Sequence, residues 1–405
     1  MKRDFLILIT AEYPFGFMSE VFLESEIPYL SNYFKKILIL PRKFTDKKIR
    51  HFPKNCEVFD TLYKDNDIKF IKHKYPVIIK TIFMFILELY NINFFKIIFN
   101  YRFYLNRIAN EINASEKIYL LIKRVKISSP VIYNYWSFGN ALSVSILKKN
   151  GIVAKAVCRS HGYDLYDERW SIGHLPFRKF VYKHFDSIHP VSKFGLEYLK
   201  RKTHKKFHHK INCSYLGIDN NFTLMKKPKN KVPLIVSCSS IISLKRVNLI
   251  PSLLKQLNFP VKWIHFGTGP LIDEVKSECH KLPSQIEWSL RGSVESSIIK
   301  QFYQNNHIDL FLSTSESEGL PYTMIEAISF CIPIAGCNVG GISEIINKKT
   351  GVLLPKEPQI EEWADIIKAF LTKTKKLNLN AICLHQQKNF SANKNYNKFI
   401  LKFLH

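Results

Sequence analysis

Short apolar runs recur along the chain, each followed by a polar or Gly/Pro turn and then by a longer segment with helical periodicity. Apolar strands that alternate with helices predict parallel, doubly wound sheets, because a parallel strand needs a crossover connection. This alternation therefore predicts an α/β fold. The nine runs are Phe5–Thr10, Lys36–Leu40, Val131–Tyr135, Ala154–Arg159, Ser187–Val191, Leu234–Ser237, Val261–Phe266, Asp309–Ser313 and Ile332–Gly336.

The runs fall into two groups, separated by the polar, charged and proline-bounded stretch Met225–Pro233. A stretch of this composition is typical of a linker, and the length of 405 residues suggests about two or three domains. We expect Rossmann-like domains at residues 1–222 and 231–385, facing each other across a cleft. Apolar residues at helical spacing predict a closing helix at 386–405. Ligands of such folds bind at the carboxyl ends of the strands.

Composition excludes a mainly disordered chain, because 46% of the residues are apolar. The net charge of +27 has two interpretations. It indicates a polyanionic partner, such as an anionic membrane or a phosphorylated substrate, or it reflects the Lys-, Ile-, Asn- and Phe-rich composition of an AT-rich genome. Nucleic acid is the weaker form of the first interpretation, since no zinc-finger spacing, basic-region heptad or aromatic RNA-binding signature is present.

The eight cysteines include no Cys-x-x-Cys pair, so a zinc cluster is not expected. The first apolar run, Phe5–Thr10, is too short for the apolar region of a secretory signal. We therefore expect a cytosolic protein with reduced thiols.

The most apolar stretch, Val77–Phe99, is interrupted by lysine, glutamate and asparagine, and we do not expect it to span a membrane. The wider region Lys69–Lys126 mixes large apolar residues with Lys and Arg. This composition is typical of basic amphipathic helices that lie in a membrane interface. The alternative is that these are ordinary helices packed on a sheet.

The segment after Asp309–Ser313 carries the most chemistry, because it lies between an apolar strand and a helix. Glu318 falls in the loop and Glu326 lies further on, in the helix, while Gly319 allows close approach of a ligand to the backbone. The N–H groups near Leu320 form a helix N-terminus, which favours phosphate. Two carboxylates beside such a phosphate site can accept hydrogen bonds from sugar hydroxyls. The alternative is a plain helix start.

Several ordered blocks resemble the family 4 glycosyltransferases, retaining enzymes with two Rossmann-like domains in the arrangement called GT-B. The blocks are Ser317-Glu-Gly-Leu-Pro-Tyr-Thr-Met-Ile-Glu-Ala327, Ile332-Pro-Ile-Ala335, Gly340-Gly-Ile-Ser-Glu-Ile-Ile346 and Thr350-Gly-Val-Leu-Leu354. The resemblance implies that Glu318 contacts the donor sugar and that Glu326 holds the ribose. It also places Gly319, Leu320 and Pro321 against the donor. Cys331 stands where the family usually has Gly.

A second block, Ser237–Arg246, follows the first strand of the second domain. Lys245 and Arg246 can neutralise a diphosphate leaving group. In the family an Arg precedes this Lys by five residues, and Ser240 occupies that place here. The resemblance therefore implies a cation clamp in which Arg246 replaces the missing Arg. The later block Leu290–Val294 matches the strand whose backbone contacts the nucleobase, which implicates Gly292 and Val294.

In the first domain, Arg159-Ser-His-Gly-Tyr-Asp164 follows a predicted strand. The histidine of this block approaches the donor sugar and the reaction centre in the family, so His161 is a candidate catalytic residue, with Asp164 on the acceptor side. An isolated histidine is otherwise more often structural or solvated.

The first strand leads into the stretch Glu12–Glu24, where relatives carry a Gly-rich loop over the donor phosphates. Gly16 fits this loop, although a second adjacent Gly is absent. Glu20 and Glu24 are candidates for contact with the acceptor.

The resemblance implies a retaining glycosyltransferase that needs neither metal nor cofactor and uses a nucleotide sugar, a UDP-sugar, as donor. We expect a glycan or polyprenyl-diphosphate-linked acceptor, a role in bacterial surface polysaccharide such as capsule or O-antigen, and a cytoplasmic enzyme held peripherally on the inner face of the cell membrane. No nucleic-acid partner is expected. The alternatives are a nucleotide-sugar epimerase or hydrolase of the same fold, and a non-catalytic polyanion-binding protein.

Overall fold

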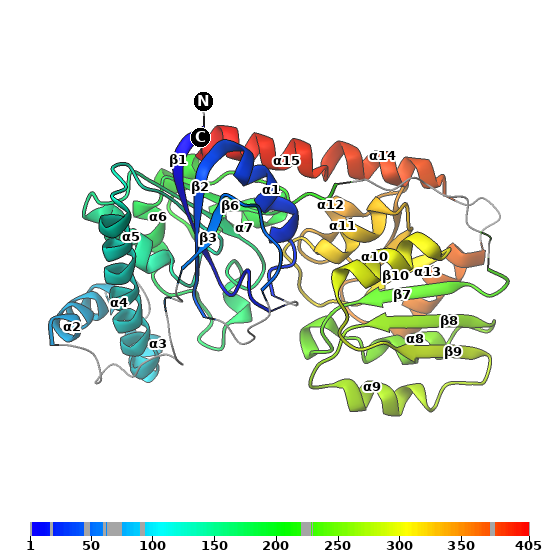
Figure 1. The fold of residues 1–405 in the computed structure, drawn as a ribbon. Helices are drawn as coiled ribbons and strands as arrows, with labels where there is room; N and C mark the ends of the chain where they lie inside the picture. The colour runs from blue at the N-terminus through cyan, green and yellow to red at the C-terminus, as the bar shows by residue number, and fades with distance from the viewer. Residues whose placement is uncertain are drawn as a thin grey trace. The chain divides into compact units, whose positions relative to one another are not determined.

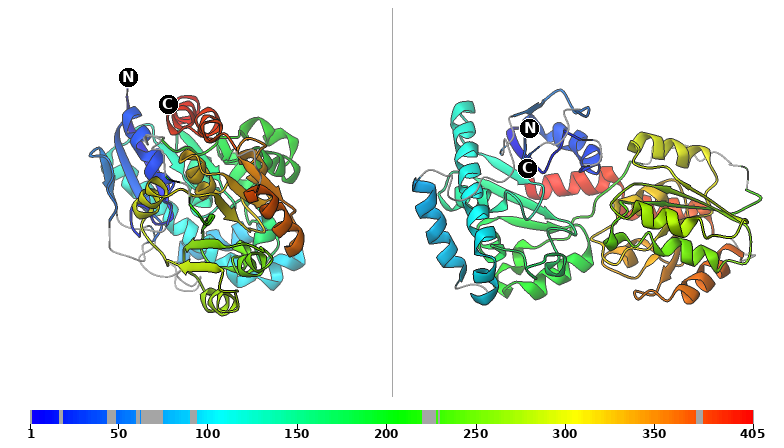
Figure 2. Two further views of the ribbon diagram at one scale, coloured as in Figure 1. Left: turned by 90° about the vertical axis from the view of Figure 1, so that its right-hand side faces the viewer. Right: turned by 90° about the horizontal axis from the view of Figure 1, so that it is seen from below.

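The computed structural model describes residues 2–16, 19–43, 49–59, 62, 75–89, 94–219, 228, 230–372 and 377–404. The chain divides into two compact units. The first unit is Met1–Ser214 with Tyr396–His405, and the second is Tyr215–Asn395. Each unit is built on one sheet, as Figures 1 and 2 show.

The chain changes unit at Ser214–Tyr215 and again at Asn395–Tyr396. The sequence pattern placed the boundary later, at 222–231, and set 386–405 apart. The reason for the difference is a pairing of distant segments: Ile218 N–H donates to Phe390 O at 2.9 Å, and the Asn395 amide donates to Leu216 O at 3.0 Å. Residues 220–227 and 229 of the expected linker region lie outside the described residues.

The first unit contains a six-stranded parallel sheet in the order β3-β2-β1-β4-β5-β6. Its central strands are continuous apolar runs because both faces are covered, and Ile7 in β1 lies opposite Leu38 and Ile132 on the two neighbouring strands. The strands are β1 (Arg3–Thr10), β2 (Phe34–Pro41), β3 (Cys56–Val58), β4 (Val131–Asn134), β5 (Lys155–Ser160) and β6 (Ser187–Pro190).

Helices cover this sheet and extend beyond it. They are α1 (Leu23–Tyr33), α2 (Tyr75–Leu89), α3 (Phe94–Phe99), α4 (Tyr101–Val125), α5 (Ala141–Lys149), α6 (Arg178–His184) and α7 (Lys193–Lys202). The expected helices in Lys69–Lys126 are therefore α2, α3 and α4, while residues 69–74 lie outside the described residues. No described helix is both long and apolar enough to cross a bilayer.

The second unit contains another six-stranded parallel sheet, in the order β12-β11-β10-β7-β8-β9. Its strands are β7 (Leu234–Cys238), β8 (Val261–Phe266), β9 (Ile286–Leu290), β10 (Leu310–Ser313), β11 (Ile334–Cys337) and β12 (Gly351–Leu354). Its helices are α8 (Leu249–Lys255), α9 (Ile272–Cys279), α10 (Ser296–Asn305), α11 (Tyr322–Ser329), α12 (Ile342–Ile345), α13 (Ile360–Thr372) and α14 (Leu379–Asn389). The helix α15 (Ala392–Phe399) crosses the unit boundary.

All nine predicted runs are strands, and the three strands outside those runs are β3, β9 and β12. Each of these three lies at the edge of its sheet. An edge strand has only one neighbour and is less completely covered, so it does not need a continuous apolar run. The expected closing helix at 386–405 is the end of α14, then α15 and a final π-helical turn at Ile400–Leu404.

The strand order of each sheet reverses at one place, between β1 and β4 in the first unit and between β7 and β10 in the second. Loops that leave the carboxyl ends of strands on the two sides of such a place diverge, and ligands of doubly wound folds bind there. A ligand site is therefore expected among the residues of the loops after β1, β4, β7 and β10.

Candidate functional site

The loops after β7 and β10 are bonded into one surface in the second unit. The Thr314 hydroxyl is 3.0 Å from both the Lys245 and the Arg246 carbonyl oxygens, and Glu316 N–H donates to Leu244 O at 2.9 Å. These contacts fix residues 244–246 against residues 314–316. The strand order reverses here, so this is the place where a ligand is expected.

Lys245 and Glu318 meet on this surface. Lys245 Nζ lies 2.5 Å from Glu318 Oε1. Glu318 is 7% exposed, while the Lys245 side chain is 23% exposed. The ammonium group has three N–H donors and the carboxylate oxygen accepts one of them, so Lys245 can also donate to an anionic ligand. The structure thus brings two of the predicted site residues together.

Arg246 contacts the loop after β10. Its Nε donates to Thr314 O at 2.8 Å, and its Nη2 lies 3.3 Å from both Ser315 O and Lys356 O. Its guanidinium carbon lies 5.5 Å from the centre of the Trp363 ring. Two nitrogens of the Arg246 fork, Nε and Nη2, are thus used by backbone carbonyl groups and hold the loop after β10, so a role for Arg246 beside Lys245 in the predicted clamp stays a prediction.

Glu326 lies on α11 and is 4% exposed. Its Oε1 is 3.4 Å from the Ser296 hydroxyl and 3.8 Å from Lys300 Nζ, both on α10. The pKa of Cys238, at the end of β7, is raised to about 12, first by burial and then by the Glu326 charge, with Lys245 acting in the opposite direction. Glu326 and Lys245 are thus both near the carboxyl end of β7.

Ser296 and Lys300 were not predicted as site residues. They belong to a helix that follows a different strand, and no local motif connects them with Glu326. The only sequence signal is the position of Ser296 at the start of a helix just after the Leu290–Val294 block.

The Gly-Gly block packs against the backbone of Glu318 and Gly319. Gly340 has a φ of +54°, and a Cβ atom there would overlap the carbonyl oxygen of Glu318. Gly341 N–H donates to Gly319 O at 3.0 Å. Gly340 is therefore required for the position of Glu318. Gly319, Leu320 and Pro321 are buried, and Pro321 caps α11.

The predicted nucleobase segment lies at the end of β9. Gly267 N–H donates to Gly292 O and Arg291 N–H donates to His265 O, each at 2.8 Å. Gly292 and Val294 are partly exposed. Beneath them, His265 is held by the Ser237 hydroxyl and Ser239 O, and burial lowers its pKa to about 4.

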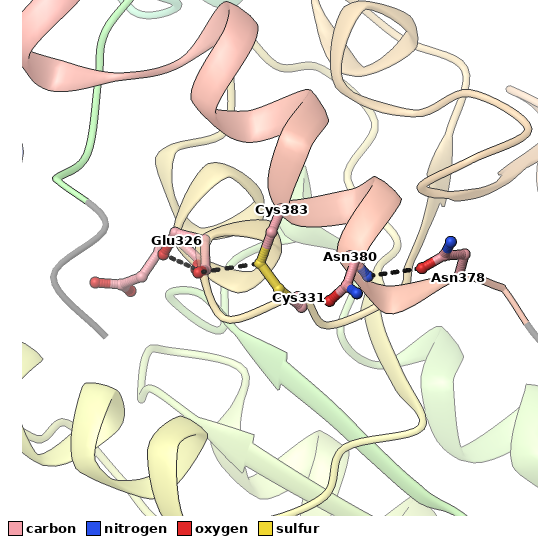
Figure 3. The surroundings of a disulfide bond; sticks show 6 residues. Glu326, Cys331, Asn378, Asn380 and Cys383 are labelled. Carbon is pink, nitrogen blue, oxygen red and sulfur yellow. Dashed lines mark hydrogen bonds between the residues drawn. A yellow bond between two sulfur atoms is a disulfide. The ribbon is translucent and has the colours of Figure 1, made fainter. Parts of the chain in front are cut away.

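Cys331 and Cys383 form a disulfide, with Cα atoms 5.0 Å apart (Figure 3). This corrects the expectation that all thiols are reduced, and it could not be anticipated because the two residues are 52 positions apart. The bond joins the end of the helix that carries Glu326 to α14. The Glu326 carboxylate extends away from it in Figure 3. Cys331 has a φ of +59°, a conformation that favours Gly, the residue usual here in the family it resembles.

His161, in the first unit, follows β5 and is 7% exposed. Its ring lies against Phe22, Tyr135 and Trp136, with ring centres 4.5–5.2 Å apart. Burial, and then the charge of Arg159, lower its pKa to about 3, so the ring is neutral at physiological pH. Among the described residues neither ring nitrogen has a hydrogen-bond partner. A buried polar group without a partner calls for an explanation, and a bound ligand is one.

Asp164 is buried, and its carboxylate accepts the N–H groups of His161 and Ser137, each at 2.6 Å. Burial raises its pKa to about 6, although these hydrogen bonds act in the opposite direction. The prediction that Asp164 contacts the acceptor is corrected, because the carboxylate is used in joining the loops after β4 and β5. It positions the backbone of His161.

Glu20 is likewise turned inward. Its carboxylate accepts the N–H groups of Ala11, Glu12 and Tyr13 at 2.8–2.9 Å and the indole N–H of Trp136 at 2.7 Å. Glu20 therefore shapes the loop after β1 and fixes the Trp136 ring beside His161, which corrects its predicted acceptor role.

Two further predicted residues lie in the same loop region. Glu24 forms an ion pair with Arg50 at 3.0 Å, with its side chain 35% exposed. Gly16 has a φ of +64°, and residues 17 and 18 beside it lie outside the described residues.

An aromatic group that was not predicted lies in the loops after β4 and β5. The Phe138 and Trp170 rings have centres 4.5 Å apart, and those of Trp170 and Tyr163 are 4.7 Å apart. Trp170 donates its indole N–H to Tyr163 O at 2.8 Å, while the Tyr163 side chain is 55% exposed. Aromatic residues in the loops that follow strands are a sequence signal for such a group.

No three His, Cys, Asp or Glu side chains in the described part of the chain are grouped as a metal site requires. That the reaction needs no metal stays a prediction.

Comparison with known proteins extends these observations. Residues 221–382 match the model of the family described as glycosyl transferases group 1. The sulfoquinovosyl transferase SQD2 of Arabidopsis thaliana is 31% identical over 126 residues, which is 30% of this chain. The matched segment spans 23% of the length of that curated relative.

Several solved structures match almost the whole chain. The lipopolysaccharide outer core galactosyltransferase WaaB has a TM-score of 0.68 at 15% identity, covering 98% of this chain and 99% of WaaB. HepE of Anabaena, solved with UDP and glucose, has a TM-score of 0.67 at 16% identity over 99% of both chains. A glycosyltransferase of Rickettsia africae has a TM-score of 0.66 at 18% identity, covering 100% of this chain and 98% of that one. Likeness at these identities shows the fold, two parallel-sheet α/β domains of the GT-B class.

Proposed function

We propose that the protein is a glycosyltransferase that transfers a sugar from a nucleotide sugar to a glycan or lipid-linked acceptor. The observation that carries the proposal is the Lys245–Glu318 pair at the place where the second sheet reverses its strand order. The match of residues 221–382 to glycosyl transferases group 1 supports it, since this segment contains both residues and Glu326.

The donor is proposed to bind to the second unit. Lys245 would hold the diphosphate together with the start of α11, because an ammonium group and a helix N-terminus both favour phosphate. Glu326 would accept hydrogen bonds from the ribose hydroxyls, and the backbone at Gly292 and Val294 would contact the base. UDP is the proposed nucleotide, because the similar structure of HepE was solved with UDP and glucose and also with UDP-glucose.

In the reaction the bond between the anomeric carbon and the diphosphate oxygen breaks, and the acceptor hydroxyl oxygen forms the new bond. The acceptor proton passes to the departing diphosphate. Lys245 stabilises the negative charge that develops there, which is electrostatic catalysis by a preorganised group. We propose retention of configuration and no metal, following the family resemblance.

The first unit is proposed to contribute His161 and the acceptor side. A neutral imidazole has one N–H donor and one acceptor nitrogen, so it can exchange hydrogen bonds with sugar hydroxyls. The aromatic group of Phe138, Tyr163 and Trp170 offers apolar ring faces for a sugar or lipid-linked acceptor.

The biological role is proposed to be the synthesis of a bacterial cell-surface polysaccharide at the inner face of the membrane. Support comes from the likeness in fold to WaaB, an enzyme of the lipopolysaccharide outer core, and from the net charge of +27. A strongly basic protein is attracted to anionic lipid.

The test begins with thermal denaturation in the presence of UDP, GDP, ADP, CMP and their sugars, because a ligand of the native state raises the melting temperature. We expect a rise with UDP and UDP-sugars that is lost in Lys245→Ala and Glu326→Ala. Lys262→Ala, an exposed lysine paired with Glu287, is the matched control.

Turnover is then followed by UDP release with a glycan acceptor, and the anomeric configuration of the product is read by NMR. Removal of Lys245 should lower kcat about 10²- to 10³-fold, the usual effect of losing one such electrostatic group. Donor consumption that does not depend on acceptor would instead support the epimerase or hydrolase alternative. Unchanged turnover in Lys245→Ala would refute the assignment.

A further inference from the structure

Half of the large apolar side chains that are exposed in the described chain lie in one short segment. Sixteen such residues are exposed, and eight of them fall between residues 79 and 103, on α2, α3 and the start of α4. Their exposed fractions range from 38% to 84%. We call these eight the apolar face: Ile79, Ile82, Phe83, Ile86, Ile98, Phe99, Tyr101 and Phe103. Monomeric soluble proteins rarely expose so many apolar residues together, so this surface indicates a partner.

The helix α2 is apolar on two sides. Val77, Thr81 and Glu88 are buried on its inner side, where α2 packs on α4. Ile79, Ile82, Phe83 and Ile86 follow the spacing of one helical stripe on the other side, and all four are exposed. Figures 1 and 2 show α2 on the side of α4 that is turned away from the sheet. The inner stripe accounts for the folding of α2, whereas the four residues of the outer stripe remain exposed in the described part of the chain.

The charges near the apolar face are positive. Lys80 and Arg102 are exposed within it. The two acidic residues described from 75 to 115, Glu88 and Glu111, are buried, and Glu111 is paired with Arg107. The first exposed carboxylate further along α4 is Glu116. Over residues 69–126 the sequence has eleven Lys and Arg against three acidic residues. The apolar face with its positive charges is complementary to a partner that has an apolar layer and negative charges. The same positive charges would repel a second copy of this chain.

We propose that the apolar face docks into the interfacial layer of an anionic lipid bilayer, with α2 lying in the plane of the membrane. The large apolar side chains enter the boundary between headgroups and acyl chains, and Lys80 and Arg102 extend to the lipid phosphates. Membrane binding is thereby assigned to a defined surface. Its biological meaning rests on the proposed function.

Flotation of the full-length protein with vesicles tests the proposal. We expect the wild type to float with vesicles of phosphatidylcholine and phosphatidylglycerol, and much less with phosphatidylcholine alone. The double variant Phe83→Ser/Phe99→Ser should bind the anionic vesicles at least about tenfold more weakly, because it removes the two phenylalanine rings that are described as exposed on α2 and α3. The matched control is Leu384→Ser/Leu401→Ser, which removes two exposed apolar side chains from other helices.

A second variant separates the charge from the apolar contact. Lys80→Glu/Arg102→Glu should abolish the preference for anionic vesicles, because the local positive charge is then reversed. Circular dichroism and the melting temperature verify that each variant is folded.

The proposal is overturned if the wild type floats with neither vesicle, or if the phenylalanine variant floats as well as the wild type. It is also overturned if gel filtration shows a dimer that dissociates in the phenylalanine variant, since the occupant would then be a second copy. UDP release with a water-soluble acceptor is measured on the same variants. Loss of flotation with retained turnover supports the surface, whereas a wild type that floats without any turnover refutes only the proposed function.

Discussion

Substitutions in the Lys245–Glu318 pair should affect the stability of the protein and its turnover differently. In Lys245→Ala, Glu318 stays almost buried without its cation. Breaking a fully buried pair costs about 3–5 kcal/mol, and the 23% exposure of the Lys245 side chain reduces this to about 2 kcal/mol. For a unit of this size the melting temperature should fall by about 4–8 °C.

Adding Glu318→Gln removes the buried charge, so the double variant Lys245→Ala/Glu318→Gln should recover most of the lost stability. It should not recover turnover, because the cation that stabilises the departing diphosphate is still missing. Thermal denaturation by circular dichroism and UDP release, measured on both single variants and the double variant, give a complete double-mutant cycle.

Two results would refute the reasoning. The first is an unchanged melting temperature in Lys245→Ala, which would mean that the pair contributes nothing in the folded protein. The second is a double variant no more stable than Lys245→Ala, which would mean that the loss does not arise from the charge of Glu318.

Three further perturbations have expected outcomes. Gly340→Ala should lower the melting temperature and weaken UDP binding, because its Cβ would overlap Glu318 O; Gly151→Ala, also at positive φ but with open space around it, should cost only about 1–2 kcal/mol of backbone strain. Stability should fall as pH decreases from about 6.5 toward 4, by about 1.4 kcal/mol per pH unit from His265 alone, since the folded state binds its proton only near pH 4. His265→Gln should remove this contribution to the slope in denaturant titrations; His161, with its pKa lowered to about 3, acts in the same direction and remains, while Asp164, with its pKa raised to about 6, acts in the opposite direction. Tyr163→Ala should raise KM for the acceptor and leave KM for the donor unchanged, in contrast to the exposed aromatic control Phe194→Ala, which should change neither.

Much of the fold and part of the site follow from local sequence pattern. A central strand of a doubly wound sheet is covered on both faces, which favours an apolar run; all nine runs are strands, and eight of them are central strands. Loops after these strands must lie at one edge of the sheet, and Lys245 and Glu318, both assigned to the donor site by the family resemblance, meet at that edge. Three of the four edge strands, β3, β9 and β12, lie outside the nine runs because partial exposure relaxes that requirement, whereas the fourth, β6, is fully buried and is one of the runs.

Side-chain direction was decided by the tertiary structure. Arg246, Glu20 and Asp164 carry the charges that ligand binding needs, and each is used by backbone groups of a neighbouring loop. A loop that bends sharply leaves backbone N–H and C=O groups without partners in a helix or sheet. Where water does not reach these groups, a nearby charged side chain supplies the hydrogen bonds. Sequence pattern shows that a charge is present and does not show which way it points.

The remaining features arise from contacts between distant segments. The Cys331–Cys383 disulfide, the approach of Ser296 and Lys300 to Glu326, and the aromatic surroundings of His161 each join residues from separate loops or helices. The sequence by itself determined the strands, the order of the loops and the chemical groups available, because those depend on near neighbours. Only the packed structure decided which groups meet, because burial fixes each partner through the whole fold.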